Sequence, residues 1–235
     1  MITFGSLFAG IGGLDLGLER AGMTCKWQVE IDPWCRRVLA KHWPDVERFE
    51  DVREVGKHNL EAADVIVGGD PCQDNSNASR HDIIRAELAP EFLRIIEEAR
   101  PYAVLRENPF KVRNDAPWPW WRFRAELERI GYCVLPFRLR ACCLGFSHRR
   151  DRLFLFATLP DTGSERPQRE EFSQMAESRR QVFNPARQDW RVPAPRVCRG
   201  CDGIPHRVDR LRGLGNAVVP QVAEWIGRRI VEANR

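Results

Sequence analysis

Short apolar runs alternate with amphipathic stretches along most of the chain. Runs of aliphatic and aromatic residues are typical of buried strands, whereas apolar positions three and four residues apart are typical of helices. The strand candidates are Ile2–Phe8, Lys26–Glu30, Val65–Val67, Ala103–Leu105, Val134–Leu139 and Leu153–Ala157. Two helix candidates begin after Gly13 and at Pro33. Three more cover Phe92–Ala99, Trp121–Ile130 and Val218–Val231. This alternation predicts an α/β fold with a mostly parallel sheet and helices on both of its faces.

The pattern changes at about residue 159. From Leu159 to Pro205 the chain is polar, rich in Arg, Glu, Gln, Ser and Pro, and has neither a helical nor a strand period. We therefore predict a main domain over residues 1–158, a small loop-rich region over 159–205, and a C-terminal segment over 206–235 that returns to the main domain.

Composition and charge set loose limits on function. The formal net charge of +4 permits a polyanionic partner without demanding one. Arginine supplies nearly all the cations, which suits contacts to phosphate and guanine, although a GC-rich genome gives the same bias. No apolar run reaches about 18 residues and no basic leader precedes the first strand, so we expect a soluble, cytoplasmic protein with no membrane partner.

The cysteines are scattered rather than densely spaced. There are eight of them, without the pattern of a secreted disulfide framework, which favours a reducing compartment. We therefore expect most of them, such as Cys25, Cys35 and Cys133, to be small buried residues.

A glycine turn between the first strand and the first helix is a candidate ligand site. In Phe8-Ala9-Gly10-Ile11-Gly12-Gly13 the glycines let a ligand approach the backbone, and Glu30 follows Gly10 at the spacing of about 20 residues at which a carboxylate can hold ribose hydroxyls. The adjacent Gly12 and Gly13 do not match G-x-G-x-x-G, which favours a cofactor other than NAD. Taken alone, an ordinary glycine turn is an equal alternative.

Two further segments carry candidate reacting groups. Gly68-Gly69-Asp70-Pro71-Cys72-Gln73 follows a predicted strand, and ligands bind at the carboxyl ends of strands in open α/β sheets, so Cys72 is a candidate nucleophile. A buried free cysteine fits this polar loop poorly. Arg106-Glu107-Asn108-Pro109 follows the next strand candidate and places Glu107 at the same edge, where an ordinary loop carboxylate is the alternative.

Several stretches resemble, in order, the motifs of the cytosine-5 DNA methyltransferases. They are the Phe8–Gly13 turn, the Pro71-Cys72-Gln73 loop, Glu107-Asn108, His148-Arg149-Arg150-Asp151-Arg152 and Leu214-Gly215-Asn216-Ala217-Val218-Val219-Pro220. The resemblance extends from Ile2 to about Ile230 and is far more specific than any single motif. It implies a Rossmann-like fold, S-adenosylmethionine as cofactor and double-stranded DNA as partner. We expect a monomer, and a cognate restriction endonuclease cannot be inferred from the chain.

The resemblance also implies a mechanism. Cys72 would add to carbon 6 of a cytosine that has been flipped out of the duplex. Glu107, its pKa raised by a closed site, would neutralise the charge that develops at ring nitrogen 3. Arg152 and Arg150 would hold the carbonyl oxygen of the base and a nearby phosphate. The methyl group would then pass to carbon 5, and loss of the carbon 5 proton would expel the cysteine.

The cofactor residues follow from the same resemblance. Those expected to line or close the pocket are Phe8, Gly10, Gly12, Glu30 at the ribose, Asp51 at the adenine, Pro71, Asn216 and Val218. A solvated surface carboxylate is an equal alternative for Asp51. No metal is expected, because Cys198 and Cys201 with His206 make an incomplete zinc set.

Three residues depart from the family pattern. Asp70 precedes Pro-Cys where the family more often carries Pro or an aromatic residue, His148 stands where Gln is common, and Pro109 replaces the usual Val. None of these departures removes a reacting group. They therefore bear on efficiency and substrate preference rather than on reaction class.

Other functions compete with this interpretation. An RNA cytosine methyltransferase or an enzyme acting on free cytosine nucleotides would use similar groups, and DNA is preferred over RNA because of the resemblance. The glycine turn with Glu30 favours a methyl donor over a folate donor, and intact Cys72, Glu107 and Arg152 oppose a catalytically inactive DNA-binding protein. Residues 159–205, shorter than the recognition lobe of many members, are hypothesised to read a short DNA target; a solvated insert is the alternative.

Overall fold

The structure is a computed structural model, and it describes residues 1–71, 88–109, 119–146, 150–160 and 213–233. Its strands are β1 (Thr3–Leu7), β2 (Thr24–Val29), β3 (Glu47–Phe49), β4 (Val65–Gly68), β5 (Ala103–Pro109), β6 (Cys133–Arg140) and β7 (Asp151–Thr158). Its helices are α1 (Gly13–Arg20), α2 (Pro33–His42), α4 (Leu88–Ala99), α5 (Trp120–Arg129) and α8 (Pro220–Ala233), with short 3-10 turns η1 (Val52–Glu54) and η2 (Ala141–Leu144).

The strands form one sheet in the order β3-β2-β1-β4-β5-β7-β6. Strands β1 to β5 pair in parallel, whereas β7 runs antiparallel to both β5 and β6. The carboxyl ends of β1 to β5 therefore share one edge of the sheet. The strand order reverses between β1 and β4, and in open α/β sheets ligands bind at such a switch point.

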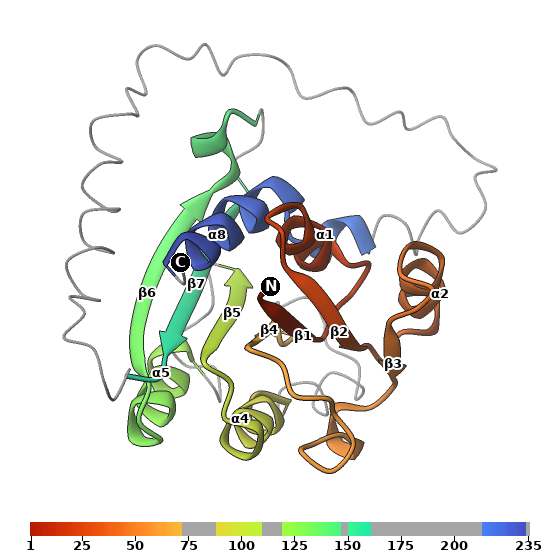
Figure 1. Cartoon of the computed structure of the whole chain (residues 1–235). Helices are drawn as coiled ribbons and strands as arrows, with labels where there is room; N and C mark the ends of the chain where they lie inside the picture. Colours follow the sequence, from red (N-terminus) through yellow and green to blue (C-terminus); the bar gives the residue numbers. More distant parts are fainter. Residues whose placement is uncertain (72–87, 110–118, 147–149, 161–212, 234–235) are drawn as a thin grey trace, which may run out of the picture.

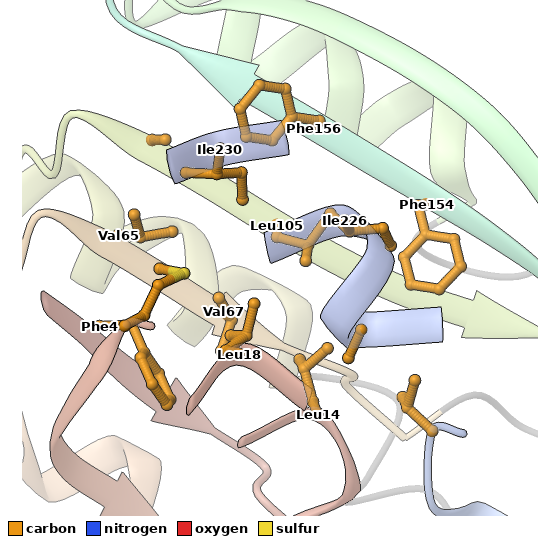
Figure 2. Close-up of a cluster of buried hydrophobic side chains, with 14 of the residues drawn as sticks. Phe4, Leu14, Leu18, Val65, Val67, Leu105, Phe154, Phe156, Ile226 and Ile230 are labelled. Atoms are coloured by element: carbon orange, nitrogen blue, oxygen red, sulfur yellow. The ribbon is translucent and has the colours of Figure 1, made fainter. Parts of the chain in front are cut away.

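Helices cover both faces of the sheet, as Figure 1 shows: α1 and α8 lie on one face, and α4 and α5 on the other. Alternate residues of a strand point to opposite faces of the sheet. Because helices cover both faces, the central strands are apolar on both. Val65 and Val67 of β4 belong to the core beneath α1 and α8 (Figure 2), whereas Ile66 between them belongs to the core beneath α4 and α5.

The C-terminal helix packs closely on the first helix because two glycines leave room for it. A Cβ atom at Gly17 would lie 2.2 Å from the main-chain oxygen of Pro220, and one at Gly13 would lie 2.4 Å from that of Val218. The chain before and within α8 is thus held against the glycine turn and α1.

The predicted α/β class and the parallel central strands are confirmed. The main revision concerns β5, which extends to Pro109 and so contains Glu107 rather than ending before it. The reason is β7, whose Phe154 pairs antiparallel with Glu107 and continues the ladder to Pro109. Helix α8 begins at Pro220, two residues after the predicted start, as suits a proline at the first helical position.

Two further predictions concern buried cysteines and membrane spans. Cys25 and Cys35 are buried as expected, but the prediction for Cys133 was wrong: it is exposed, because it begins the edge strand β6. Among the described residues, no helix is long and apolar enough to cross a membrane.

Some of the predictions fall outside the described residues. These are Cys72, His148, Cys198, Cys201, His206 and nearly all of the predicted recognition region 159–205.

Candidate active site

The predicted site residues lie at the shared carboxyl edge of the parallel strands. The residues concerned are Phe8, Gly10 and Gly12 after β1, Glu30 after β2, Asp51 after β3, Pro71 after β4 and Glu107 near the end of β5. Val218 reaches the same edge from the C-terminal segment, with its main-chain oxygen against Gly13. Asn216 lies in the same segment, two residues before Val218.

Two glycines of the turn differ in the space around them: Gly10 has room for a side chain, whereas Gly12 does not. Phe8, Gly10 and Gly12 all adopt left-handed backbone conformations, with φ angles of 55°, 58° and 80°. A Cβ atom at Gly10 would meet nothing within 4 Å, whereas one at Gly12 would lie 2.4 Å from the ring of Trp43. Gly10 therefore leaves backbone open to a ligand, and Gly12 permits the turn to pack on the protein.

Glu30 connects this turn to the end of β2. Its carboxylate accepts hydrogen bonds from the main-chain nitrogens of Gly10 at 2.7 Å and Asp32 at 2.8 Å. Burial raises its pKa, and these two hydrogen bonds oppose the rise. Asp32 in turn caps α2 by accepting from the nitrogens of Trp34 and Cys35. The Glu30 carboxylate is thus fixed beside the open backbone of Gly10, where it can accept hydrogen bonds from hydroxyl groups.

Asp51 is engaged with its own neighbours. Its side chain accepts hydrogen bonds from the main-chain nitrogen and the guanidinium of Arg53, and so caps η1. The hydrogen bonds from Arg53 hold the pKa of Asp51 below its usual range. Contact of Asp51 with an adenine stays a prediction.

Glu107 is a buried carboxyl group at this edge. It is 6% exposed, and its Oε1 lies 2.5 Å from Nε of Arg152, close enough for an ion pair but without hydrogen-bond alignment. Burial raises its pKa to about 7, although Arg152 and Arg150 oppose the rise. A carboxyl group of this kind carries a proton in a large fraction of molecules near neutral pH, so it can act as an acid.

Two arginines lie beside Glu107. Arg150 donates from Nη1 to the main-chain oxygen of Gly215 at 2.8 Å and from Nη2 to that of Ala217. Its pKa is lowered by burial and by the charge of Arg152. The structure therefore brings both arginines to Glu107 and also ties Arg150 to the C-terminal segment. Their contacts with a base or a phosphate stay predictions.

A buried ion pair between Asp70 and Arg106 was not foreseen. The sequence showed Asp70 as a departure from the family pattern but gave it no partner. The available signal was an arginine directly after one apolar run and an aspartate shortly after the neighbouring one. Two opposite charges in neighbouring buried segments indicate a pair, because an isolated charge is rarely buried.

A sequence model described as C-5 cytosine-specific DNA methylase matches residues 2–189. The chain belongs to this family. Its relatives include the type II methyltransferase M2.BsuMI of Bacillus subtilis, 34% identical over 162 residues, which are 66% of this chain and 41% of that protein. M.AquIA of Picosynechococcus is 36% identical over 177 residues, covering 64% of this chain and 69% of that one. The chain thus matches less than half of the length of M2.BsuMI.

Solved structures agree with the family assignment. An E. coli protein encoded within a prophage and described as a putative DNA modification methyltransferase has a TM-score of 0.58 at 28% identity, over 68% of this chain and 47% of that one. A mutant of Spodoptera frugiperda DNMT2 has a TM-score of 0.59 at 18% identity, over 72% of this chain and 54% of that one, which supports the fold alone.

Proposed function

We propose that this chain catalyses methyl transfer from S-adenosylmethionine to carbon 5 of cytosine in double-stranded DNA. Family membership supports the reaction class. The observation that carries the proposal is Glu107, a buried carboxyl group with a pKa of about 7, at the strand end next to the one from which Pro71 and Cys72 follow. A general acid is most effective when its pKa lies near the working pH, so such a group suits protonation of a ring nitrogen at neutral pH.

Each reacting group has a separate role in this proposal. The Cys72 thiolate forms a bond to carbon 6 of the flipped cytosine, and Glu107 donates its proton or a hydrogen bond at nitrogen 3. Arg152, which lies against Glu107, holds the carbonyl oxygen of the base in this proposal. Carbon 5 then takes the methyl group from the sulfonium. Loss of the carbon 5 proton to solvent re-forms the double bond and breaks the bond to sulfur, which restores the thiolate, while nitrogen 3 returns any proton to Glu107.

The residues at β1 and β2 fit the cofactor. The open backbone at Gly10 and the fixed carboxylate of Glu30 offer a surface for a ribose, with hydroxyls donating to the carboxylate. When bound there, S-adenosylmethionine supplies an electrophilic methyl group. Val218, against Gly13, borders the same surface from the C-terminal side.

Covalent trapping tests the proposal. Base-resolution methylation mapping of DNA from expressing cells would first identify the target. A duplex with 5-fluorocytosine at that position should then form a denaturant-stable complex, because fluorine does not leave as a proton does. Cys72→Ala should form no complex and transfer no methyl group, whereas Cys142→Ala, at a partly exposed cysteine of η2, should behave as wild type. A Cys72→Ala variant with near wild-type activity would disprove attack by Cys72.

We further propose that residues 159–205 read the target sequence. Their arginine and glutamine side chains are the types that pair with guanine and adenine edges. Exchanging this segment for that of a relative with another target should move the methylated site while trapping by Cys72 persists. A folded, active chimera that still methylates the original sequence would place recognition elsewhere.

A further inference from the structure

Asp70, two residues after the end of β4, forms an ion pair with Arg106 in the middle of the neighbouring strand β5. Nε of Arg106 lies 2.5 Å from Oδ1 of Asp70, and Nη2 of Arg106 lies 2.7 Å from Oδ2. The side chains are only 2% and 6% exposed. Because burying two charges costs much of what their attraction returns, such a pair is weak evidence for stability. Its position suggests a role in the site.

Further contacts hold the pair on the face of the sheet that carries α5. The guanidinium of Arg106 stacks on the ring of Phe123 of α5, 4.0 Å from its centroid. The side-chain nitrogen of Asn108 donates to the main-chain oxygen of Asp70 at 3.2 Å. Asp70 is therefore held through both its side chain and its backbone by alternate residues of β5.

Glu107 lies between Arg106 and Asn108 in the strand and so projects to the opposite face. There it contacts the residue before Asp70: a Cβ atom at Gly69 would lie 3.0 Å from Oε2 of Glu107 and 3.3 Å from its main-chain oxygen. The backbone of Gly69 thus rests directly on Glu107. Gly69 directly precedes Asp70, so the contacts of Asp70 also restrict the backbone that meets Glu107.

The pair also contributes to the charge around Glu107. The main charged groups that act on Glu107 are Arg152 and Arg150 from the β7 side and Asp70 after β4. The two arginines lower the pKa of Glu107, whereas the charge of Asp70 raises it. Arg106, paired with Asp70, partly neutralises that charge.

We propose that Asp70 and Arg106 are a positioning pair that fixes the end of β4 against β5 and sets the charge balance around Glu107. The inference rests on the proposed function, in which Glu107 supplies a proton or hydrogen bond to the base. It gives a role to Asp70, which departs from the family pattern, and to Arg106, its buried partner.

The test compares Asp70→Asn, Arg106→Met and the double variant with wild type. Arg94→Met is the matched control, since Arg94 is a partly buried arginine of α4 that pairs with Glu91 and Glu98. The first measurement is the pKa of the Glu107 carboxyl by carbon-13 NMR of the full chain, with the signal assigned from Glu107→Gln. The second is the pH at which methyl transfer declines on the alkaline side.

The two single variants should move the pKa of Glu107 in opposite directions. Asp70→Asn removes a negative charge and leaves the cation of Arg106 unneutralised, so the pKa should fall by about one pH unit. Arg106→Met leaves Asp70 unneutralised, so the pKa should rise. The double variant should lie near wild type, and the alkaline limb of activity should follow the same order. Arg94→Met should lower the melting temperature without moving either quantity.

Shifts of the same sign in both single variants, or no shift in either, would overturn the pairing role. If one single variant does not fold, the other single variant and the double variant still give the sign. The NMR measurement needs no methyl transfer, so the two proposals fail separately. If the pKa of Glu107 shifts as expected in the variants but the wild-type chain methylates no DNA, only the proposed function is contradicted. If the chain methylates DNA but the pKa of Glu107 does not change in the Asp70 and Arg106 variants, only the positioning pair is contradicted.

Discussion

Arg152 places its Nε 2.5 Å from Oε1 of Glu107, so a cation on β7 directly faces a buried carboxyl group on β5. Such a contact lowers the pKa of a carboxyl group, but here burial has the larger effect and the pKa of Glu107 rises to about 7. The two opposing effects leave Glu107 near its titration midpoint at neutral pH. Small changes in its surroundings therefore change how much of the acid form is present.

Methyl transfer should decline as pH rises through the pKa of Glu107. If the protonated carboxyl group is the reactive form, kcat/KM is full below about pH 7 and falls above it. Glu107→Gln should lower the rate by about 100-fold or more and should remove this decline, while DNA binding changes little. Glu128→Gln, at an ion-paired surface residue of α5, serves as the control. Equal losses of DNA binding and rate would instead make Glu107 a structural residue.

Replacing Glu30 should weaken cofactor binding. The carboxylate is held by the nitrogens of Gly10 and Asp32 beside open backbone, so its loss removes a charged acceptor for the ribose. Glu30→Ala should weaken binding of S-adenosylmethionine by about 10- to 100-fold in calorimetric titration. Glu61→Gln, which disrupts the exposed pair with Lys26, is the control. An unchanged affinity in Glu30→Ala would reject the ribose role.

The contacts of Arg150 predict a coupling between the active site and the C-terminal segment. Both of its terminal nitrogens donate to main-chain oxygens, those of Gly215 and Ala217, and a lysine cannot supply two directed donors. Arg150→Lys should therefore speed amide exchange in residues 213–219 and weaken S-adenosylmethionine about tenfold. The control is Arg228→Lys at an exposed pair of α8. A loss confined to DNA affinity would favour the phosphate contact that the family resemblance implies.

The sequence predicted the central strands β4 and β5 because each of them contains a continuous run of apolar residues. Val65–Val67 and Ala103–Leu105 are continuous apolar runs, as expected of strands buried on both faces. The end of β5 was missed because Arg106, Glu107 and Asn108 are polar. Their strand conformation depends on pairing with β7, more than 40 residues away, which local sequence does not reveal.

The sequence predicted where the candidate site residues lie on the sheet, but it did not predict which residues they contact. The motifs identified the edge at which Glu30 and Glu107 lie, because each follows or ends a parallel strand. The partners of Asp70 and Arg150 depend on tertiary packing between segments that are distant in sequence. The pKa of Glu107 is likewise a property of burial, which appears only when β4, β5 and β7 are assembled.

A second buried carboxyl group should make stability depend on pH. Asp15 of α1 is fully buried, accepting hydrogen bonds from Ser6 at 3.1 Å and Gln28 at 2.9 Å. Burial raises its pKa from 3.8 to about 6, despite these hydrogen bonds. Since its pKa is higher in the folded state, folding takes up a proton between these two values. The stability from this group is full below the lower value and is lost as pH rises to about 6.

Asp15→Asn should remove that dependence. Between pH ~5 and ~7.5 the wild type should lose about 1–2 kcal/mol more of its unfolding free energy than the variant, as measured by urea denaturation. Glu107, whose pKa is also raised, contributes a loss in an overlapping range, so the comparison is repeated in Glu107→Gln. There the remaining pH slope should come largely from Asp15 and should vanish in the double variant. If wild type and Asp15→Asn show equal slopes, Asp15 is already ionised in the folded state at the lower pH. The hydrogen bonds from Ser6 and Gln28 would then outweigh its burial.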